Sequence, residues 1–174
     1  SCIDVFAHFA HLPYAILLDS ANSEHVDSRF DIIAIEPKST LEVQNNLSIL
    51  NNQPDARSCF EIMNSELLKL NNNKAANNLP FSGGWLGYLG YDLGRTLENL
   101  PSSAINDIDL PQMAVGLYLD ALIYDKQQSS WFYIAQPKVN RLALYQQYLA
   151  QPAIMPSFAL KTAWQSNMSR ADYA

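Results

Sequence analysis

Cysteine, histidine and basic residues are all scarce in this chain of 174 residues. It contains two cysteines and three histidines, and its 17 acidic residues outnumber its 11 lysines and arginines, which gives a net charge of −6. Two cysteines are too few for a scaffold held by disulfides, so we expect a reduced, cytoplasmic setting. The acidic balance argues against a nucleic acid or an anionic membrane surface as partner.

Long apolar runs are missing as well. No segment approaches the roughly 20 apolar residues of a membrane-spanning helix, and no basic-then-apolar signal peptide is present. We therefore expect neither a membrane nor a nucleic acid as partner. Hydrophobic residues still make up 48% of the chain, so a sizeable core can form. The length suits one domain with a piece of a second.

Glycine is also rare, and five of the six glycines lie within residues 79–101, at positions 83, 84, 87, 90 and 94. Their spacing is neither that of a phosphate-binding P-loop, since no lysine follows, nor that of a dinucleotide-binding turn. Glycine weakens an ordinary strand and usually marks close packing. We therefore predict a buried central strand over residues 81–90, followed by a short helix that starts at Tyr91.

The apolar pattern elsewhere predicts helices and antiparallel hairpins. Helices are expected at residues 4–12 with Asp4 as the cap, at 54–70 opened by Pro54-Asp55, and at 140–150. Further strands are expected at residues 14–20, 28–35, 40–44, 47–50, 113–124, 131–135 and 158–162. Hairpins separated by helices indicate an α+β fold, with antiparallel β-sheets and helices packed outside them.

The C-terminus carries the signal for a helix that stops after one turn. Ser169-x-x-Asp172 resembles a capping box, and a helix of one turn is not stable alone. The chain also lacks an initiator methionine. We therefore interpret it as an N-terminal piece of a longer protein, with one domain over residues 1–162 and the start of a C-terminal domain over residues 163–174.

Few polar residues suggest local chemistry. His8 and His11 share a predicted helix face, but their spacing and the lack of a third ligand argue against a metal site. Asp92 and Arg95 are three residues apart, as in a local ion pair on a helical turn. The alternative is that these two residues belong to an interface with another domain.

Arg29 is the most unusual charge, because it falls in an otherwise apolar predicted strand. A buried guanidinium must find an anion or several carbonyl groups. One interpretation is an ion pair with Asp27 or Asp31 at the strand edge. The other is a pocket for a zwitterion, completed by Asp19-Ser20 at the end of the preceding strand.

The segment Pro80-Phe-Ser-Gly-Gly-Trp-Leu-Gly-Tyr-Leu-Gly-Tyr-Asp-Leu-Gly-Arg95 resembles the signature of the chorismate-utilising synthases, within their N-terminal domain. That family includes anthranilate synthase component I and aminodeoxychorismate (para-aminobenzoate) synthase component I. Four further blocks are similar in the same order, at residues 11–20, 28–37, 110–118 and 164–169. Two of these segments are more similar to the aminodeoxychorismate synthases, namely Ser28-Arg-Phe-Asp-Ile32 and Trp164-Gln-Ser-Asn-Met168. Asp19 does not decide between the two kinds of synthase, so an anthranilate synthase stays an open alternative.

The resemblance implies that the full-length protein makes 4-amino-4-deoxychorismate from chorismate and ammonia, for para-aminobenzoate and folate synthesis. A glutamine amidotransferase subunit would supply the ammonia, and Mg²⁺ would bind with chorismate. In this family the catalytic groups lie in the C-terminal chorismate-binding domain, so the resemblance implies no catalytic residue, metal or cofactor in this chain.

The same resemblance implies that the chain contributes one wall of an L-tryptophan pocket, either regulatory or structural. The residues that correspond to this wall are Ser20, Asp27, Ser28, Arg29 and Phe30. Two alternatives remain open at this point. One is the corresponding domain of an anthranilate synthase, with tryptophan as feedback inhibitor, and the other is a stand-alone ligand-binding module.

Overall fold

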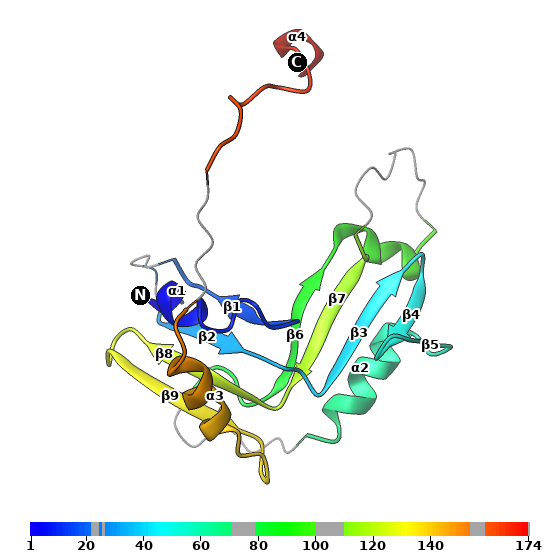
Figure 1. Ribbon diagram of the computed structural model, residues 1–174. Helices are drawn as coiled ribbons and strands as arrows, with labels where there is room; N and C mark the ends of the chain where they lie inside the picture. Colours follow the sequence, from blue (N-terminus) through cyan, green and yellow to red (C-terminus); the bar gives the residue numbers. More distant parts are fainter. Residues whose placement is uncertain (22–24, 26, 71–78, 100–109, 154–158, 174) are drawn as a thin grey trace.

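A computed structural model describes residues 1–21, 25, 27–70, 79–99, 110–153 and 159–173. These residues form two antiparallel sheets that carry helices on their outer sides (Figure 1), and the chain passes from one sheet to the other twice. The four-stranded sheet has the order β1 (Ile16–Leu18), β2 (Phe30–Ala34), β8 (Asp120–Asp125) and β9 (Ser130–Ala135). The five-stranded sheet has the order β5 (Gln53–Asp55), β4 (Leu47–Leu50), β3 (Ser39–Gln44), β7 (Met113–Tyr118) and β6 (Gly84–Leu89).

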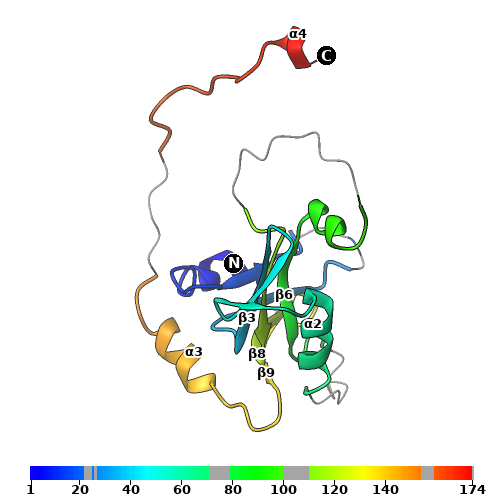
Figure 2. The same ribbon diagram turned by 90° about the vertical axis from the view of Figure 1, so that its right-hand side faces the viewer.

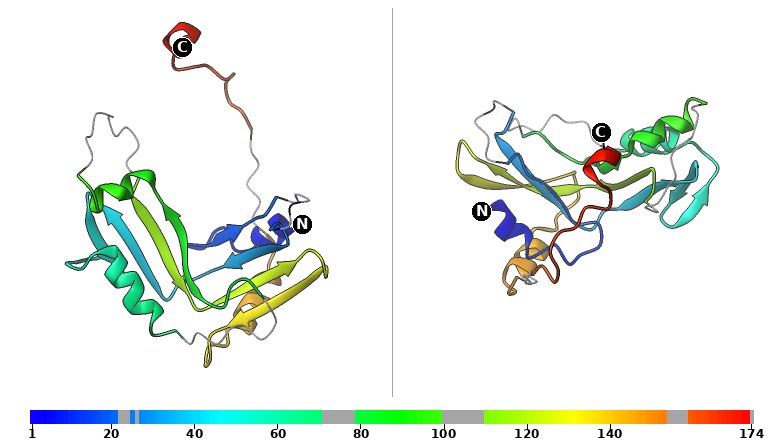
Figure 3. Two further views of the ribbon diagram at one scale, coloured as in Figure 1. Left: turned by 180° about the vertical axis from the view of Figure 1, so that it is seen from behind. Right: turned by 90° about the horizontal axis from the view of Figure 1, so that it is seen from above.

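The helices cover separate sheets. Helices α1 (Cys2–Phe6) and α3 (Leu142–Leu149) pack on the four-stranded sheet, where Phe9 and Tyr145 meet edge to face with ring centroids 5.7 Å apart. Helix α2 (Cys59–Leu67) lies on the other side of the strands from α3 (Figure 2). Residues 159–169 run away from this body to α4 (Arg170–Tyr173) (Figure 3).

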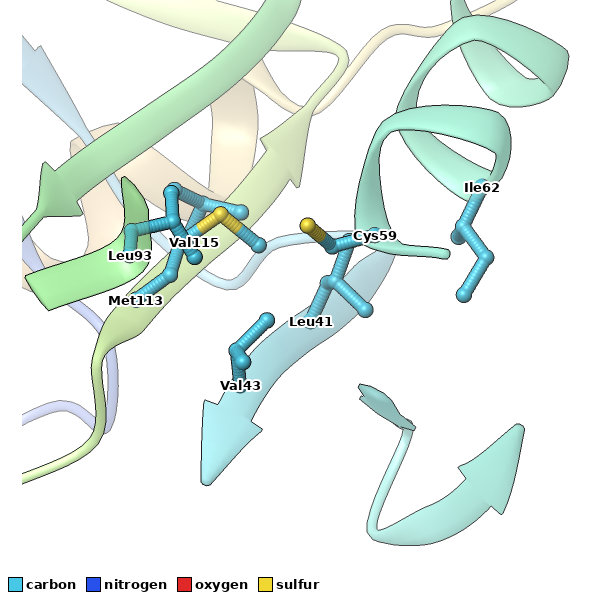
Figure 4. Packing of buried hydrophobic residues seen from close by; sticks show 7 residues of the cluster. All are labelled: Leu41, Val43, Cys59, Ile62, Leu93, Met113 and Val115. Atoms are coloured by element: carbon cyan, nitrogen blue, oxygen red, sulfur yellow. The ribbon is translucent and has the colours of Figure 1, made fainter. Parts of the chain in front are cut away.

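The core of the five-stranded sheet lies under α2, because the inward-facing residues of β3 and β7 meet the apolar side of that helix (Figure 4). Its buried members are Leu41, Val43, Cys59, Ile62, Leu93, Met113 and Val115. A separate cluster joins the two sheets, with Ile32, Tyr118 and Ile123 fully or nearly buried and Leu86 of β6 packed against them. The α+β prediction, with antiparallel sheets and helices outside, is confirmed.

The predicted strand at residues 113–124 is divided at Leu119, where the chain passes from the five-stranded sheet to the four-stranded sheet. Asp120, the first residue of β8, is fully buried. Arg141 donates to both oxygens of its carboxylate, and Tyr133 donates to Oδ2 at 2.9 Å. A polar network therefore fixes the chain where it changes sheets.

The glycine-rich segment forms a strand, but its predicted central position is wrong. Strand β6 lies at the edge of the five-stranded sheet and pairs only with β7 among the described strands, and Tyr88 and Leu89 are exposed. The glycines do permit a close approach, as expected. A Cβ added to Gly87 would lie 2.1 Å from the carbonyl oxygen of Ala114 on β7. The close contact is thus made within a sheet and not between layers.

Three further predictions need correction. Helix α1 is capped by Ser1 with Asp4 at its third position, so it begins before the predicted cap. Helix α2 is capped by Ser58 with Glu61 in a capping box, and the predicted opening at Pro54-Asp55 instead forms β5. Residues 159–162, the described part of the predicted last strand, are not in a strand.

Other predictions are confirmed. Asn45 and Asn46 have φ values of 50° and 63°, which suits the tight turn expected between β3 and β4. The short helix after β6 is a 3₁₀-helix, η1 (Tyr91–Thr96), and α3 and α4 occupy the expected segments. Among the described residues, no helix has the length and apolar character needed to cross a bilayer.

Candidate functional site

The predicted pocket residues lie at one end of the four-stranded sheet, where β1 ends, β2 begins and the β8–β9 turn passes. Leu18 pairs with Ile32, and Phe30 pairs with Asp125. Continuing the β1–β2 register by two residues would bring Ser20 opposite Phe30. The pairing of three strands thus gathers side chains that are distant in the sequence.

Arg29 is held by Asp125 of β8. Its Nε and Nη2 donate to the two carboxylate oxygens at 3.0 and 2.6 Å, and its guanidinium lies 4.7 Å from the centroid of the Phe30 ring. The predicted ion pair with Asp27 or Asp31 is therefore wrong, and Arg29 precedes β2 instead of lying within it. The hydrogen bonds from Arg29 hold the pKa of Asp125 below its usual range.

Ser20 is held by Asp31 and Lys126. The N–H and Oγ of Ser20 donate to Oδ1 of Asp31 at 2.9 and 2.8 Å, and Nζ of Lys126 donates to the Ser20 Oγ at 2.8 Å. Nζ of Lys126 also lies 3.2 Å from Oδ1 of Asp31. Burial would raise the pKa of Asp31, but the hydrogen bonds from Ser20 and Lys126 outweigh that effect and lower it. Asp31 is therefore ionised at neutral pH.

Two consecutive residues, the last of β8 and the first of the β8–β9 turn, thus hold two of the predicted pocket residues. Asp125 binds Arg29 and Lys126 binds Ser20, and the backbone N–H of Lys126 donates to the Arg29 carbonyl at 2.9 Å. The sequence contains no local signal for these contacts, because the partners are 96 and 106 residues apart. Only the antiparallel pairing of β2 with β8 brings them together.

The structure brings together Ser20, Ser28, Arg29 and Phe30, since the Ser20 Oγ also lies 3.0 Å from the carbonyl oxygen of Ser28. Asp27 is directed elsewhere. Its side chain is exposed, and its carboxylate lies 3.4 Å from Nδ1 of His25. Asp27 therefore forms neither a hydrogen bond nor an ion pair with the Arg29 guanidinium, and its place in the pocket stays a prediction.

The cluster around Arg29 combines an apolar surface with a guanidinium that has further N–H donors. Asp125 accepts hydrogen bonds from Nε and Nη2 of Arg29, whose side chain is 32% exposed, so the other N–H groups of Arg29 can donate to a ligand carboxylate. Leu18, 42% exposed, lies on the same face of the sheet as Ile32 and Phe30. This arrangement suits a ligand that has a carboxylate next to a large apolar group.

The described residues give no comparable support for a metal site. Within the part of the chain that the structure describes, no cluster of three or more histidine, cysteine, aspartate or glutamate side chains could hold a metal ion. The donor set that Mg²⁺ prefers, several oxygen ligands around one point, is not assembled by these residues. We therefore assign no step through Mg²⁺ to this chain.

The sequence matches the chorismate binding enzyme family over residues 13–174. The chain belongs to that family. It is 39% identical to an aminodeoxychorismate synthase component 1 from Klebsiella aerogenes, over 97% of this chain and 38% of that protein. It is 32% identical to an anthranilate synthase component 1 from Acetivibrio thermocellus, over 79% of this chain and 29% of that protein.

A solved structure supports the fold of this chorismate binding enzyme family member. Anthranilate synthase component I from Streptococcus pneumoniae TIGR4 matches with a TM-score of 0.59 and 21% identity, over 83% of this chain and 34% of that one. The resemblance predicted from the glycine segment is confirmed. The chain spans 38% of the length of the aminodeoxychorismate synthase relative, so the activity of a whole protein of that length is a matter for proposal.

Proposed function

We propose that this chain forms the N-terminal, non-catalytic domain of an aminodeoxychorismate synthase component I. The observation that carries the proposal is the 39% identity to such a protein over 97% of the chain. In the proposed full-length protein, a C-terminal chorismate-binding domain with Mg²⁺ makes 4-amino-4-deoxychorismate. A glutamine amidotransferase subunit supplies the ammonia, and this chain scaffolds the catalytic domain and helps to dock that subunit.

A product assay tests the proposed activity. A protein of the relatives' length that carries this chain is incubated with chorismate, ammonium and Mg²⁺, and the products are separated by chromatography. We expect 4-amino-4-deoxychorismate, and we expect no turnover by the 174-residue chain alone, because the proposal places the catalytic groups in the C-terminal domain. Fluorescent anthranilate as the product would instead favour the second candidate, which the 32% identity to an anthranilate synthase component supports.

We further propose that Ser20, Ser28, Arg29 and Phe30, with Asp27 as the least supported member, form one wall of a pocket for L-tryptophan. The Arg29 N–H groups that Asp125 does not engage would donate to the ligand carboxylate, and the indole would lie against Phe30 and the exposed Leu18. The remaining wall would belong to the C-terminal domain.

Calorimetry on the full-length protein tests this pocket. Arg29→Ala should weaken L-tryptophan binding about tenfold or more, because a charge-assisted contact to the carboxylate is lost. Arg57→Ala is the matched control, since Arg57 makes a similar pair of hydrogen bonds to Asp55 away from the site. Equal tryptophan affinity in both variants would remove Arg29 from the pocket.

A further inference from the structure

A hollow of about 570 Å³ lies beside α1, between that helix and the ends of β2 and β8. Its lining includes Ile3 of α1, Asp19 after β1, Asp31 of β2, Tyr124 of β8 and Lys126 of the β8–β9 turn. The volume is sufficient for a small organic molecule.

This hollow lies on the opposite face of the sheet from Phe30. Asp31 pairs with Tyr124, and two residues along, Ile33 pairs with Leu122, so these four side chains share one face. Ile33 and Leu122 pack against the residues of α1 and α3, which identifies that face as the helix-covered one. Phe30 belongs to the cluster between the two sheets. The hollow therefore lies on the opposite face of the sheet from the Phe30 side of the proposed tryptophan pocket, and Ser20 of that pocket contacts the hollow only through Asp31 and Lys126 among the hydrogen bonds of the described residues.

One oxygen of Asp31 has no hydrogen-bond partner among the described residues. The Asp31 side chain is only 4% exposed, and its Oδ1 receives the hydrogen bonds from Ser20 and the contact from Lys126. Its Oδ2 receives none from the described residues. No fully buried side-chain oxygen or nitrogen in the described part of the chain lacks a partner, and Asp31 borders the hollow. A nearly buried carboxylate oxygen without a donor favours a ligand that supplies one.

The rest of the lining selects for a cation with an apolar body. Asp19 and Asp31 contribute two negative charges. The lining also holds two positive charges, and both already have an acidic partner: Lys126 contacts Oδ1 of Asp31, and the N-terminal ammonium of Ser1 pairs with Asp4 at 2.7 Å. Ile3 is 54% exposed, and the Tyr124 ring is held against Trp131 with centroids 5.0 Å apart. An aromatic face beside carboxylates attracts an organic ammonium group.

We propose that this hollow binds a small organic cation, a primary ammonium attached to an apolar or aromatic group. The ammonium donates to Oδ2 of Asp31 and to the carboxylate of Asp19, and the apolar part packs against Ile3 and Tyr124. The inference does not rest on the proposed synthase activity or on tryptophan binding, because the side chains that would touch the cation are not among those assigned to the tryptophan pocket.

Calorimetry at neutral pH with 2-phenylethylamine as probe tests the site on the 174-residue chain. The amine should bind at least about tenfold more tightly than 2-phenylethanol or 3-phenylpropionate, which lack the charged donors. Asp31→Asn should weaken amine binding by about tenfold or more, because an amide that keeps the Ser20 hydrogen bonds at its oxygen presents a donor to the hollow. Asp92→Asn is the control, because the exposed Asp92 carboxylate lies on η1 and does not line the hollow. The affinity of this variant for the amine should be unchanged.

A second variant keeps the test decisive if Asp31→Asn loses its native circular dichroism spectrum. The N–H of Ala21 donates to Oδ1 of Asp19 at 2.8 Å, and Asp19→Asn keeps an oxygen that can accept this hydrogen bond. The variant should still lower the affinity for the amine severalfold. Arg29→Ala should leave amine binding unchanged. The proposal is overturned if the amine shows no binding at about 10 mM, if the alcohol binds equally well, or if Asp19→Asn and a folded Asp31→Asn both bind like the original chain.

Discussion

Replacing Arg141 with methionine is expected to lower the free energy of unfolding by about 3–5 kcal/mol. The Asp120 carboxylate is fully buried, and Arg141 donates to both of its oxygens and also to the carbonyl oxygen of Ile35 at 3.1 Å. Without the guanidinium a charged group remains buried without its counter-charge. The expected loss is a large part of the roughly 5–15 kcal/mol that stabilises an ordinary domain.

Urea denaturation followed by circular dichroism measures this loss, and the chain offers a matched control. Arg57 donates from Nε and Nη2 to Asp55 with the same two-point geometry, but its side chain is 49% exposed. Arg57→Met should therefore cost only about 1 kcal/mol or less. If the two methionine variants unfold at the same urea concentration, burial of Asp120 does not make its ion pair important for stability.

Replacing Gly87 with alanine is expected to cost about 3 kcal/mol or more. An added Cβ would lie 2.1 Å from the carbonyl oxygen of Ala114 and 2.7 Å from the Cα of Val115, and backbone atoms of a paired strand cannot rotate away. Gly87 also has a φ of +153°, which L side chains rarely adopt. Strand β6 would have to separate from β7 at the sheet edge.

Gly84→Ala separates the two causes. Gly84 has a φ of +152°, nearly the same as that of Gly87, but its added Cβ would meet nothing nearer than Cε2 of Phe81 at 3.6 Å. Both variants therefore carry the backbone strain and only Gly87→Ala carries the collision, so a difference of about 2 kcal/mol is expected in urea unfolding. Equal losses would mean that the approach of β7 does not require a glycine.

The residue pattern predicted which segments form strands better than it predicted where those strands lie. The glycine spacing indicated close backbone approach, and Gly87 makes it, but an edge strand and a central strand differ in the number of their partners. Those partners are set by pairing across the chain, which local spacing does not encode. The apolar run of β6 therefore suggested burial that the exposed Tyr88 and Leu89 do not have.

Local sequence signals can also point to the wrong residue as a helix start or as an ion-pair partner. Ser58-x-x-Glu61 has the spacing of a capping box and marks the start of α2, whereas Pro54-Asp55, which also has the composition of a helix start, lies in β5. For Arg29, the nearest acidic residues in the sequence suggested the ion-pair partner. The actual partner, Asp125, is 96 residues away and could be found only from the pairing of β2 with β8.

The adjacency of Asp125 and Lys126 constrains how this hairpin can vary. A single inserted residue between them would rotate the following side chain to the other side of the backbone, so one of the two tethers would be lost. Length changes at the tip, beyond Gln128, would leave both tethers in place. Among homologous chains, we expect insertions in this hairpin to accumulate at its tip and to spare the dipeptide at its base.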